Sequence, residues 1–309
     1  MKISYQQRII ATAIGMLLVV VLMVLALSFP RTDRTVKVMD LLFVLDITQS
    51  MDVKDVELDG EKVSRLAWAQ AHAKDLLQTL PCGSHVGLAA FSESRSLVLM
   101  NPVEVCSSYN DLSQMLAKID GSIAWALSSE LSKAVFGAID QAKLMTPSPD
   151  IVFITDGHEA PPLHDSLFPK YKKGLEDVTG VFVGVGGDEL LPIPKHDLEG
   201  NADGFWEQND VLHEDVYASL RGEPEEVRAA RPRNQHLSSQ KKSHLTDLSK
   251  RLSFDYLVSP NNADTLLTAL EGKVKTRDQV INYNWAPWFS AVALLLLALI
   301  YFPFRFFRH

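Results

Sequence analysis

An apolar run ends abruptly in an acid and two hydroxyls at alternate positions in the stretch Leu41-Leu42-Phe43-Val44-Leu45-Asp46-Ile47-Thr48-Gln49-Ser50-Met51. Five consecutive apolar residues predict a central parallel strand that is covered on both faces. Ligands of open α/β sheets gather at the carboxyl ends of such strands. Asp46, Thr48 and Ser50 are hard oxygen donors, which Mg²⁺ and Ca²⁺ prefer. The stretch therefore predicts a cation site; the alternative is a strand followed by an Asx or Ser/Thr turn.

Strand and helix patterns alternate after this run, which predicts an α/β fold with a doubly wound, mostly parallel sheet. The apolar runs 85–91 and 96–100 are joined by four polar residues, as in an antiparallel hairpin at a sheet edge. The other expected helices and strands lie at 64–77, 109–118, 129–145, 150–155, 178–185, 253–258 and 263–270.

Residues from about 188 to 243 interrupt this alternation. They contain prolines, glycines and a charged run without strong periodicity. A loop of this length inside a compact domain is usually functional or disordered. Because the segment follows the carboxyl end of a predicted strand, we expect an insertion on the ligand side of the sheet.

A second acid completes the expected site. Asp156 follows the buried run 150–155, so two strand-end carboxylates should meet on neighbouring central strands. Ser128 and Ser129 precede the next predicted helix and offer a further hydroxyl, although serines there also cap helices. The expected metal ligands are Asp46, Thr48, Ser50, Ser129 and Asp156.

Composition restricts the function classes. The 309 residues are 47% hydrophobic, which allows one sizeable core and one or two domains. The net charge of −8 disfavours nucleic-acid binding, because that function needs a basic face. An acidic domain suits cation binding better.

Two uncharged apolar stretches, 9–29 and 286–304, are each long enough to cross a bilayer as a helix. The first is alternatively a cleaved signal peptide, because Lys2 and Arg8 precede it, but its length favours an uncleaved anchor. The expected organisation is a tail (1–8), a span (9–29), a linker (30–36), the α/β domain (37–272), a linker (273–285), a span (286–304) and a tail (305–309).

Two spans place both tails on one side of the membrane and the middle region on the other. Positive residues occur in the tails and also just inside the middle region, so the positive-inside rule does not choose the side. Cys82 and Cys106 both lie in the middle region. An even pair is compatible with a disulfide in an oxidising compartment; the alternative is two buried free thiols.

Three segments carry a family resemblance: Asp46-Ile47-Thr48-Gln49-Ser50, the hydroxyl before the helix at 129–145, and Thr155-Asp156-Gly157. Together they resemble the three loops of the metal-ion-dependent adhesion site in von Willebrand factor type A domains. The resemblance covers roughly 37–270 without the insertion. It implies a von Willebrand factor A-like fold and an ion, Mg²⁺ or else Ca²⁺ or Mn²⁺, with one position open for a partner's carboxylate.

This sequence departs from the family pattern at two positions. The family usually has Ser where this chain has Thr48, and Thr where it has Ser129, and both changes keep an oxygen. Ser129 is chosen over Ser128 for its spacing to Ala134 in the following helix.

A narrower resemblance rests on one span at each end and on the segments Leu80-Pro81-Cys82-Gly83-Ser84, Val103-Glu104-Val105-Cys106, Trp125-Ala126 and Thr155-Asp156-Gly157-His158-Glu159-Ala160-Pro161-Pro162. These resemble the MxaL type of protein found with bacterial methanol dehydrogenases. The resemblance implies an inner-membrane, two-pass protein with a periplasmic central domain and cytoplasmic termini. It would assist maturation, through calcium insertion, of a methanol dehydrogenase or related quinoprotein, together with a MoxR-type ATPase and other von Willebrand factor A proteins. A Bat-like envelope-stress or MoxR-associated chaperone component is the alternative.

An enzymatic alternative takes His158 and Glu159, next to Asp156, as the base and acid of a metal-dependent hydrolase. General acid–base catalysis needs a positioned pair and a substrate pocket. The sequence has no Gly-rich phosphate cradle, nucleophile elbow or His-Glu-x-x-His helix. We therefore expect a binding module rather than an enzyme, with His158 as a partner-facing or structural side chain.

Overall fold

The computed structural model describes residues 5–28, 31–121, 124, 128–162, 169–172, 174, 178–197, 200–214, 218–220, 222–259 and 263–301. Trp125 and Ala126, which contribute to the narrower resemblance, lie outside the described residues. The chain forms two compact units. One is Lys37–Arg277, and the other combines Met1–Val36 with Asp278–His309.

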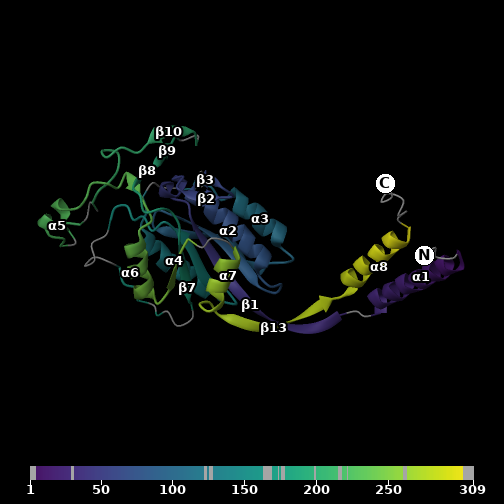
Figure 1. The fold of residues 1–309 in the computed structure, drawn as a ribbon. Coiled ribbons are helices and arrows are strands. Elements are labelled where there is room, and N and C mark those ends of the chain that lie inside the picture. The colour runs from purple at the N-terminus through teal and green to yellow at the C-terminus, as the bar shows by residue number, and fades with distance from the viewer. Residues whose placement is uncertain are drawn as a thin grey trace, which may run out of the picture. The chain divides into compact units, whose positions relative to one another are not determined.

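The structure contains a seven-stranded sheet, and six of its strands form the centre of the larger unit (Figure 1). Its strand order is β12 (Asp255–Val258), β7 (Gly180–Gly184), β6 (Asp150–Thr155), β1 (Arg31–Asp46), β4 (His85–Ser92) and β5 (Arg95–Glu104), with β13 (Thr276–Asn284) paired to β1. Neighbours along this path pair in parallel, except that β4 and β5 are antiparallel. The predicted mostly parallel α/β sheet with an antiparallel edge strand is confirmed.

Strand β1 is the central strand because its residues are apolar on both faces. Leu41 to Leu45 are fully buried, and Leu41, Phe43 and Leu45 pack into one core while Leu42 and Val44 pack into the other. This division follows from the two-residue period of a strand.

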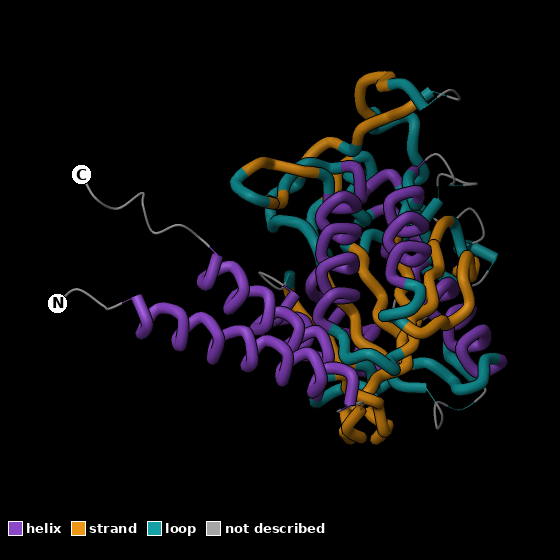
Figure 2. Tube along the Cα trace, turned by 90° about the vertical axis from the view of Figure 1, so that its right-hand side faces the viewer, coloured by secondary structure: helices purple, strands orange, loops and turns teal. Residues whose placement is uncertain are grey.

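Helices cover both faces of the sheet, as the tube trace shows (Figure 2). The first core contains residues of α2 (Arg65–Thr79), α3 (Tyr109–Lys118) and α7 (Ala263–Glu271). The second contains residues of α4 (Leu131–Leu144) and α6 (Lys242–Leu252). The fold is therefore doubly wound, and the carboxyl ends of its parallel strands lie at one edge.

Helix α4 begins two residues later than predicted. Its N-cap is Glu130, and Ser129 instead makes isolated β-bridges to Glu93 and Ala160. The helix-capping alternative for Ser129 is therefore wrong, because its backbone is already paired with the loop after β6.

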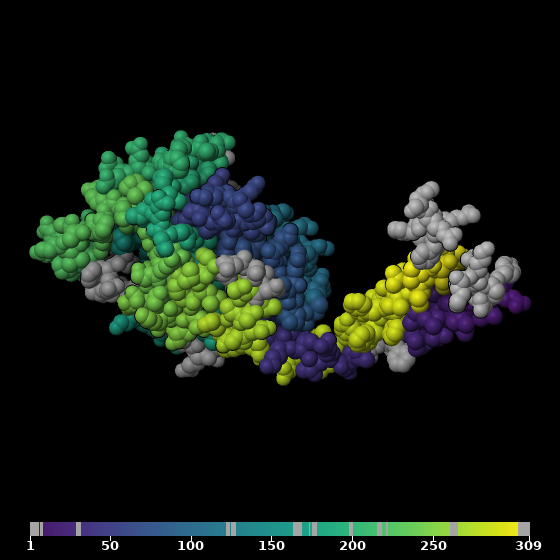
Figure 3. Space-filling model, viewed as in Figure 1, coloured from purple at the N-terminus to yellow at the C-terminus, as the bar shows by residue number. Residues whose placement is uncertain are grey.

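The insertion after β7 is built from short pieces of regular structure. Its described elements are β8 (Leu191–Pro192), β9 (Pro194–His196), β10 (Ala202–Phe205), α5 (Glu225–Ala229) and β11 (Leu237–Ser238). Antiparallel pairs join β9 to β10 and β8 to β11. The insertion lies against the segment that contains the 3-10 helix η1 (Gln49–Asp52) and the hairpin β2 (Val56–Leu58) and β3 (Glu61–Val63) (Figure 3). It thus reaches the loop that follows β1.

The smaller unit contains two apolar helices, α1 (Tyr5–Ser28) and α8 (Ala286–Tyr301). They pack so closely that a methyl group added at Gly15 would lie 2.8 Å from Cδ1 of Ile300. Among the described helices, α1 is the one long and apolar enough to cross a membrane, over Ile9–Ser28, with a mean hydropathy of 3.0. Helix α8 has 16 described residues, so the second predicted span, 286–304, stays a prediction.

Candidate metal centre

The two predicted carboxylates stand at the ends of adjacent strands. Asp46 is the last residue of β1, and Asp156 directly follows β6, which pairs with β1 in parallel. Both residues are fully buried. The fold therefore delivers two acids to one edge of the sheet without exposing either to bulk water.

Hydroxyl groups surround the carboxylate of Asp46. Its Oδ1 accepts hydrogen bonds from the backbone nitrogen of Thr48 at 2.9 Å and from Thr48 Oγ1 at 2.6 Å. Its Oδ2 accepts one from Thr155 Oγ1 at 2.6 Å. Thr48 Oγ1 and Ser50 Oγ are 3.1 Å apart. Asp46, Thr48 and Ser50 thus form one connected group of oxygen atoms.

Ser129 joins the site from the other side. Its Oγ donates to the carbonyl oxygen of His158 at 2.7 Å, and its backbone forms two hydrogen bonds with Ala160, at 2.9 and 2.8 Å. Thr48, Ser50, Ser128 and Ser129 all line one cavity of about 330 Å³. Both candidate serines therefore face the cavity, with Ser129 buried and Ser128 half-buried.

Arg65 is a member of the site that the sequence did not reveal. Its side chain is completely buried, and Nη1 donates to Asp156 Oδ2 at 2.5 Å. Nε and Nη2 form a bidentate pair with Asp55, at 2.9 and 2.6 Å. Nη1 also donates to the carbonyl oxygen of Ser50 at 3.2 Å. One guanidinium therefore connects the β1 loop to the acid that follows β6, as planar five-donor groups can.

No sequence signal marks Arg65 as buried. It follows the N-cap Ser64 in the first turn of α2, where charged side chains normally point into solvent. Its partner Asp156 is 91 residues away in the chain. The packing of α2 against the sheet brings the two together.

Residues of the insertion also take part in the hydrogen-bond network around Asp156 and Arg65. Ser238 Oγ donates to Asp156 Oδ2 at 2.8 Å and accepts from Arg65 Nη1 at 2.7 Å. The backbone nitrogen of Lys241 donates to the carbonyl oxygen of Asp156 at 2.8 Å. The insertion is thus part of the site's structure.

Gly157 allows this close packing. Its φ of +76° is in the left-handed region, and a side chain there would place Cβ 2.7 Å from Cγ of the buried Leu245. A glycine after Asp156 is therefore required by both backbone conformation and space.

The two carboxylates are electrostatically different. Burial, together with the charge of Asp156, raises the pKa of Asp46 to about 7. Burial alone would also raise the pKa of Asp156, but the charge of Arg65 and hydrogen bonds from His158 and Ser238 bring that pKa below its ordinary value. Asp156 therefore stays ionised, while none of the described residues places a cationic side chain in a hydrogen bond with Asp46.

The donor set fits a hard divalent cation. Asp46, Thr48, Ser50, Ser129 and Asp156 offer only oxygen atoms, which Mg²⁺, Mn²⁺ and Ca²⁺ prefer. A positive charge beside Asp46 would relieve the repulsion and desolvation that raise its pKa. The side chains of Arg65 and Lys241 already place positive charge near Asp156. A cation would therefore relieve more repulsion at Asp46 than at Asp156.

The proposed acid–base residues have other partners. His158 Nε2 lies 3.1 Å from Oε1 of Gln235, and burial lowers the pKa of His158. Glu159 Oε2 lies 2.7 Å from Nε2 of His244 and accepts from Ser132 Oγ at 3.2 Å. The two side chains therefore bind different residues and do not form one acid–base pair.

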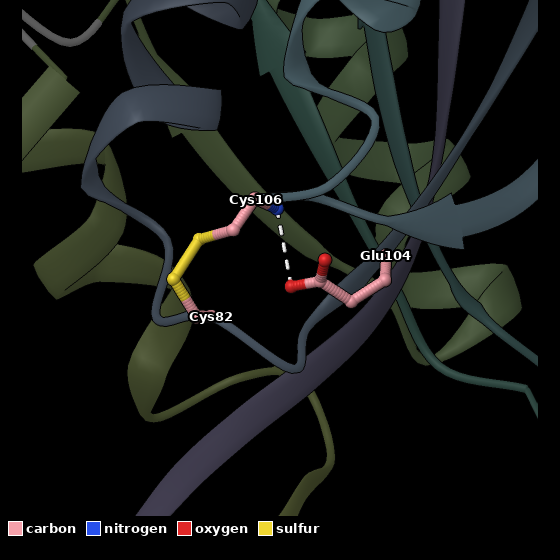
Figure 4. Close-up of side chains that lie close together, drawn as sticks. All are labelled: Cys82, Glu104 and Cys106. Carbon is pink, nitrogen blue, oxygen red and sulfur yellow. Dashed lines mark hydrogen bonds between the residues drawn. A yellow bond between two sulfur atoms is a disulfide. The ribbon is translucent and has the colours of Figure 1, made fainter. Parts of the chain in front are cut away.

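Cys82 and Cys106 are joined by a disulfide near the start of β4 and the end of β5 (Figure 4). The carboxylate of Glu104 accepts hydrogen bonds from the backbone nitrogens of Gly83, Cys106 and Ser107, at 2.7, 3.1 and 2.7 Å. Because the bridge uses both sulfur atoms, this group has no thiolate for a metal ion. The disulfide lies beyond the opposite end of β4 from the Asp46 site.

Residues 41–158 match the family model described as von Willebrand factor type A domain. This segment contains all five predicted ligands. The fold of the larger unit is accordingly von Willebrand factor A-like. The comparison with curated proteins found no match.

Several solved structures are similar to this chain. An aerotolerance-related membrane protein from Bacteroides fragilis is 19% identical, over 76% of this chain and 98% of that one, with a TM-score of 0.47. The conserved hypothetical protein BatB from Bacteroides thetaiotaomicron is 20% identical, over 76% and 96%, with a TM-score of 0.47. An uncharacterized membrane spanning protein from Vibrio fischeri is 15% identical, over 75% and 96%, with a TM-score of 0.30.

Proposed function

We propose that this von Willebrand factor A-like chain is a membrane-tethered, divalent-cation-dependent protein-binding module. The observation that carries the proposal is the convergence of Thr48, Ser50 and Ser129 on one cavity, with Asp46 hydrogen-bonded to Thr48 and Asp156 paired with Arg65. This arrangement places buried hydroxyl oxygens along the cavity lining, while both acids are buried as well. It therefore suits capture of a ligand through a cation.

Each residue has a distinct part in this proposal. Asp46 and Asp156 supply negative charge, and the hydroxyls of Thr48, Ser50 and Ser129 supply neutral ligands at the cavity surface. A bound Mg²⁺, Ca²⁺ or Mn²⁺ would supply positive charge and an open position for a carboxylate of the client. Arg65 and Ser238 hold Asp156 in place. Binding of this kind needs no turnover.

Helix α1 supports a tether, since it is long and apolar enough to span a bilayer. The Cys82–Cys106 disulfide supports an oxidising compartment for the larger unit. We therefore propose an inner-membrane protein whose central domain faces the periplasm, with α8 as a second span and cytoplasmic termini.

The client is proposed from motif resemblance. The segments around Cys82, Cys106 and Asp156 favour a quinoprotein methanol dehydrogenase, with help in calcium insertion and a MoxR-type ATPase as a further partner. None of the three structures named above is described as a methanol dehydrogenase protein. The alternative is a Bat-like role in envelope stress.

Calorimetry on the full chain in nanodiscs tests the cation requirement. We expect Mg²⁺ to bind the wild type and not Asp46→Asn, because the substitution removes the charge beside the hydroxyls. Asp247→Asn is the control, since Asp247 is an exposed acid on α6. A folded wild-type chain that binds no Mg²⁺, Ca²⁺ or Mn²⁺ would contradict the proposal.

Deletion of the chain tests the client. If the partner is a methanol dehydrogenase, the dehydrogenase purified from the deletion strain should contain less calcium than the enzyme from the wild-type strain. Metal analysis of the purified enzyme measures this. Dehydrogenase with full calcium and full activity in that strain would eliminate this client and leave the Bat-like alternative.

A further inference from the structure

The cavity above the candidate metal centre has two chemically different walls. The hydroxyl wall comes from the loops of the sheet, through Thr48, Ser50, Ser128 and Ser129. The apolar wall, a second group of lining residues, comes from the insertion and includes Ile193, Trp206, Val211 and Leu212. A cavity of about 330 Å³ is at the small end of ordinary ligand pockets. It is nevertheless larger than one carboxylate requires, so space remains beside the apolar wall.

Trp206 is held in place before any partner arrives. Its indole Nε1 donates to the side-chain oxygen of Gln49, and its backbone nitrogen donates to the carbonyl oxygen of Ile193 at 3.0 Å. Nζ of Lys195 lies 5.1 Å from the centre of the indole ring. The apolar wall is therefore pre-organised, which lowers the entropic cost of binding.

The lining of the cavity includes an apolar side chain that water still reaches. Leu212 lines the cavity and is 58% exposed. Exposed apolar groups beside a polar site are typical of surfaces that a protein partner covers. This feature favours a peptide segment over a free small acid.

Charge limits what the apolar wall accepts. Asp210 lies in the same wall, and its Oδ2 accepts a hydrogen bond from the backbone nitrogen of Glu207 at 3.3 Å. A second acid on the client would meet this carboxylate and be repelled. A peptide with one acid next to an apolar residue can place the acid near the hydroxyl wall and the apolar residue against the apolar wall. A run of acids would instead place a second carboxylate near Asp210.

We propose that the insertion forms an apolar subsite beside the carboxylate position, so that the recognised segment is an acidic residue directly adjacent to a large apolar residue. This inference rests on the proposed function, because the acid is placed at the cation. The insertion thereby determines which acidic segments are accepted.

The test uses blocked tetrapeptides and the full chain in nanodiscs with Mg²⁺. The peptides are acetyl-Gly-Asp-Leu-Gly-amide, acetyl-Gly-Leu-Asp-Gly-amide, acetyl-Gly-Asp-Gly-Gly-amide and acetyl-Gly-Asn-Leu-Gly-amide, and the readout is the Kd. We expect one of the two Asp/Leu peptides to bind about tenfold more tightly than the Asp/Gly peptide, as discrimination by an apolar pocket allows. The Asn/Leu peptide should bind far more weakly.

A pair of insertion variants locates the effect. Leu212→Ser should abolish the preference for leucine and keep Mg²⁺-dependent binding of the Asp/Gly peptide. Leu220→Ser is the matched control, because Leu220 is an exposed leucine of the insertion that does not line the cavity. Both leucines are exposed, so both variants should fold.

The outcomes separate the two proposals. Equal, Mg²⁺-dependent binding of the Asp/Leu and Asp/Gly peptides would overturn the apolar subsite and leave the proposed function intact. A preference that survives in Leu212→Ser would also overturn it. Binding of the Asn/Leu peptide as tight as that of the Asp/Leu peptides, or no Mg²⁺-dependent binding at all, would remove the proposed function and this inference together.

Discussion

Arg65 donates a 2.5 Å hydrogen bond to Asp156 across 91 residues of sequence, and neither side chain is exposed to water. The pair neutralises one of the two acids in the candidate metal centre, while Asp46 has hydroxyl and backbone donors instead. The centre is thus asymmetric, because Asp156 is paired with the guanidinium of Arg65 whereas Asp46 is hydrogen-bonded to neutral donors.

Removal of Arg65 should destabilise the larger unit strongly. Arg65→Met leaves Asp55 and Asp156 without their guanidinium, and loss of one partner of a buried ion pair costs about 3–5 kcal/mol. The measurement is urea unfolding of the full chain in detergent, with exposed Arg95→Met as the control. The double variant Arg65→Met/Asp156→Asn should lose less than the sum of the single losses; additive losses would contradict the coupling.

Ser238 should connect the insertion to cation binding. Ser238→Ala removes a donor to Asp156 and an acceptor for Arg65, which costs about 1–3 kcal/mol for buried partners. We expect weaker Mg²⁺ binding as well, because Asp156 loses part of its support. Ser219→Ala, at an exposed serine of the insertion, should match the wild type in both measurements. Unchanged Mg²⁺ affinity in Ser238→Ala would show that the insertion does not influence the centre.

The metal-free chain should become less stable as pH rises toward 8. Burial and the nearby Asp156 raise the folded-state pKa of Asp46 from 3.8 to about 7, so the folded chain holds a proton that the unfolded chain has released. This contribution to stability is fully present below about pH 4 and is lost as pH rises through about 7. Thermal unfolding with a chelator should show the decline, and Asp46→Asn should reduce it.

Added Mg²⁺ should raise the Tm more at pH 8 than at pH 5.5, because a proton competes with the cation for Asp46. The comparison uses one Mg²⁺ concentration at both pH values. An equal rise at the two pH values would exclude Asp46 as the residue for which proton and cation compete.

The disulfide should stabilise the end of the larger unit opposite to the candidate metal centre. Its cysteines are 24 residues apart, and a loop of that size corresponds to about 3 kcal/mol in the chain-entropy account. The double variant Cys82→Ser/Cys106→Ser should lose that much in urea unfolding and keep its Mg²⁺ affinity. Mass spectrometry of the native chain that finds two free thiols would contradict the bond and the oxidising compartment.

Local patterns were sufficient for much of the fold and for the outline of the site. The apolar run from Leu41 to Leu45, followed by oxygen donors, predicts a central strand and its ligand end, because burial on both faces and ligand placement at strand ends are local consequences of sheet geometry. The same reasoning places Asp46 and Asp156 side by side. The position of the insertion after β7 also follows from chain order.

Such local patterns did not predict a role in the site for Arg65, Ser238 or Trp206. Each acts at the site through a partner far away in the chain: Asp156 for Arg65 and Ser238, and Gln49 for Trp206. Their residue types are ordinary for a helix start, a loop and a surface segment. Their role in the site comes from long-range packing. The free energy of a buried guanidinium or of a hydrogen-bonded indole depends on neighbouring residues that come together only in the folded chain.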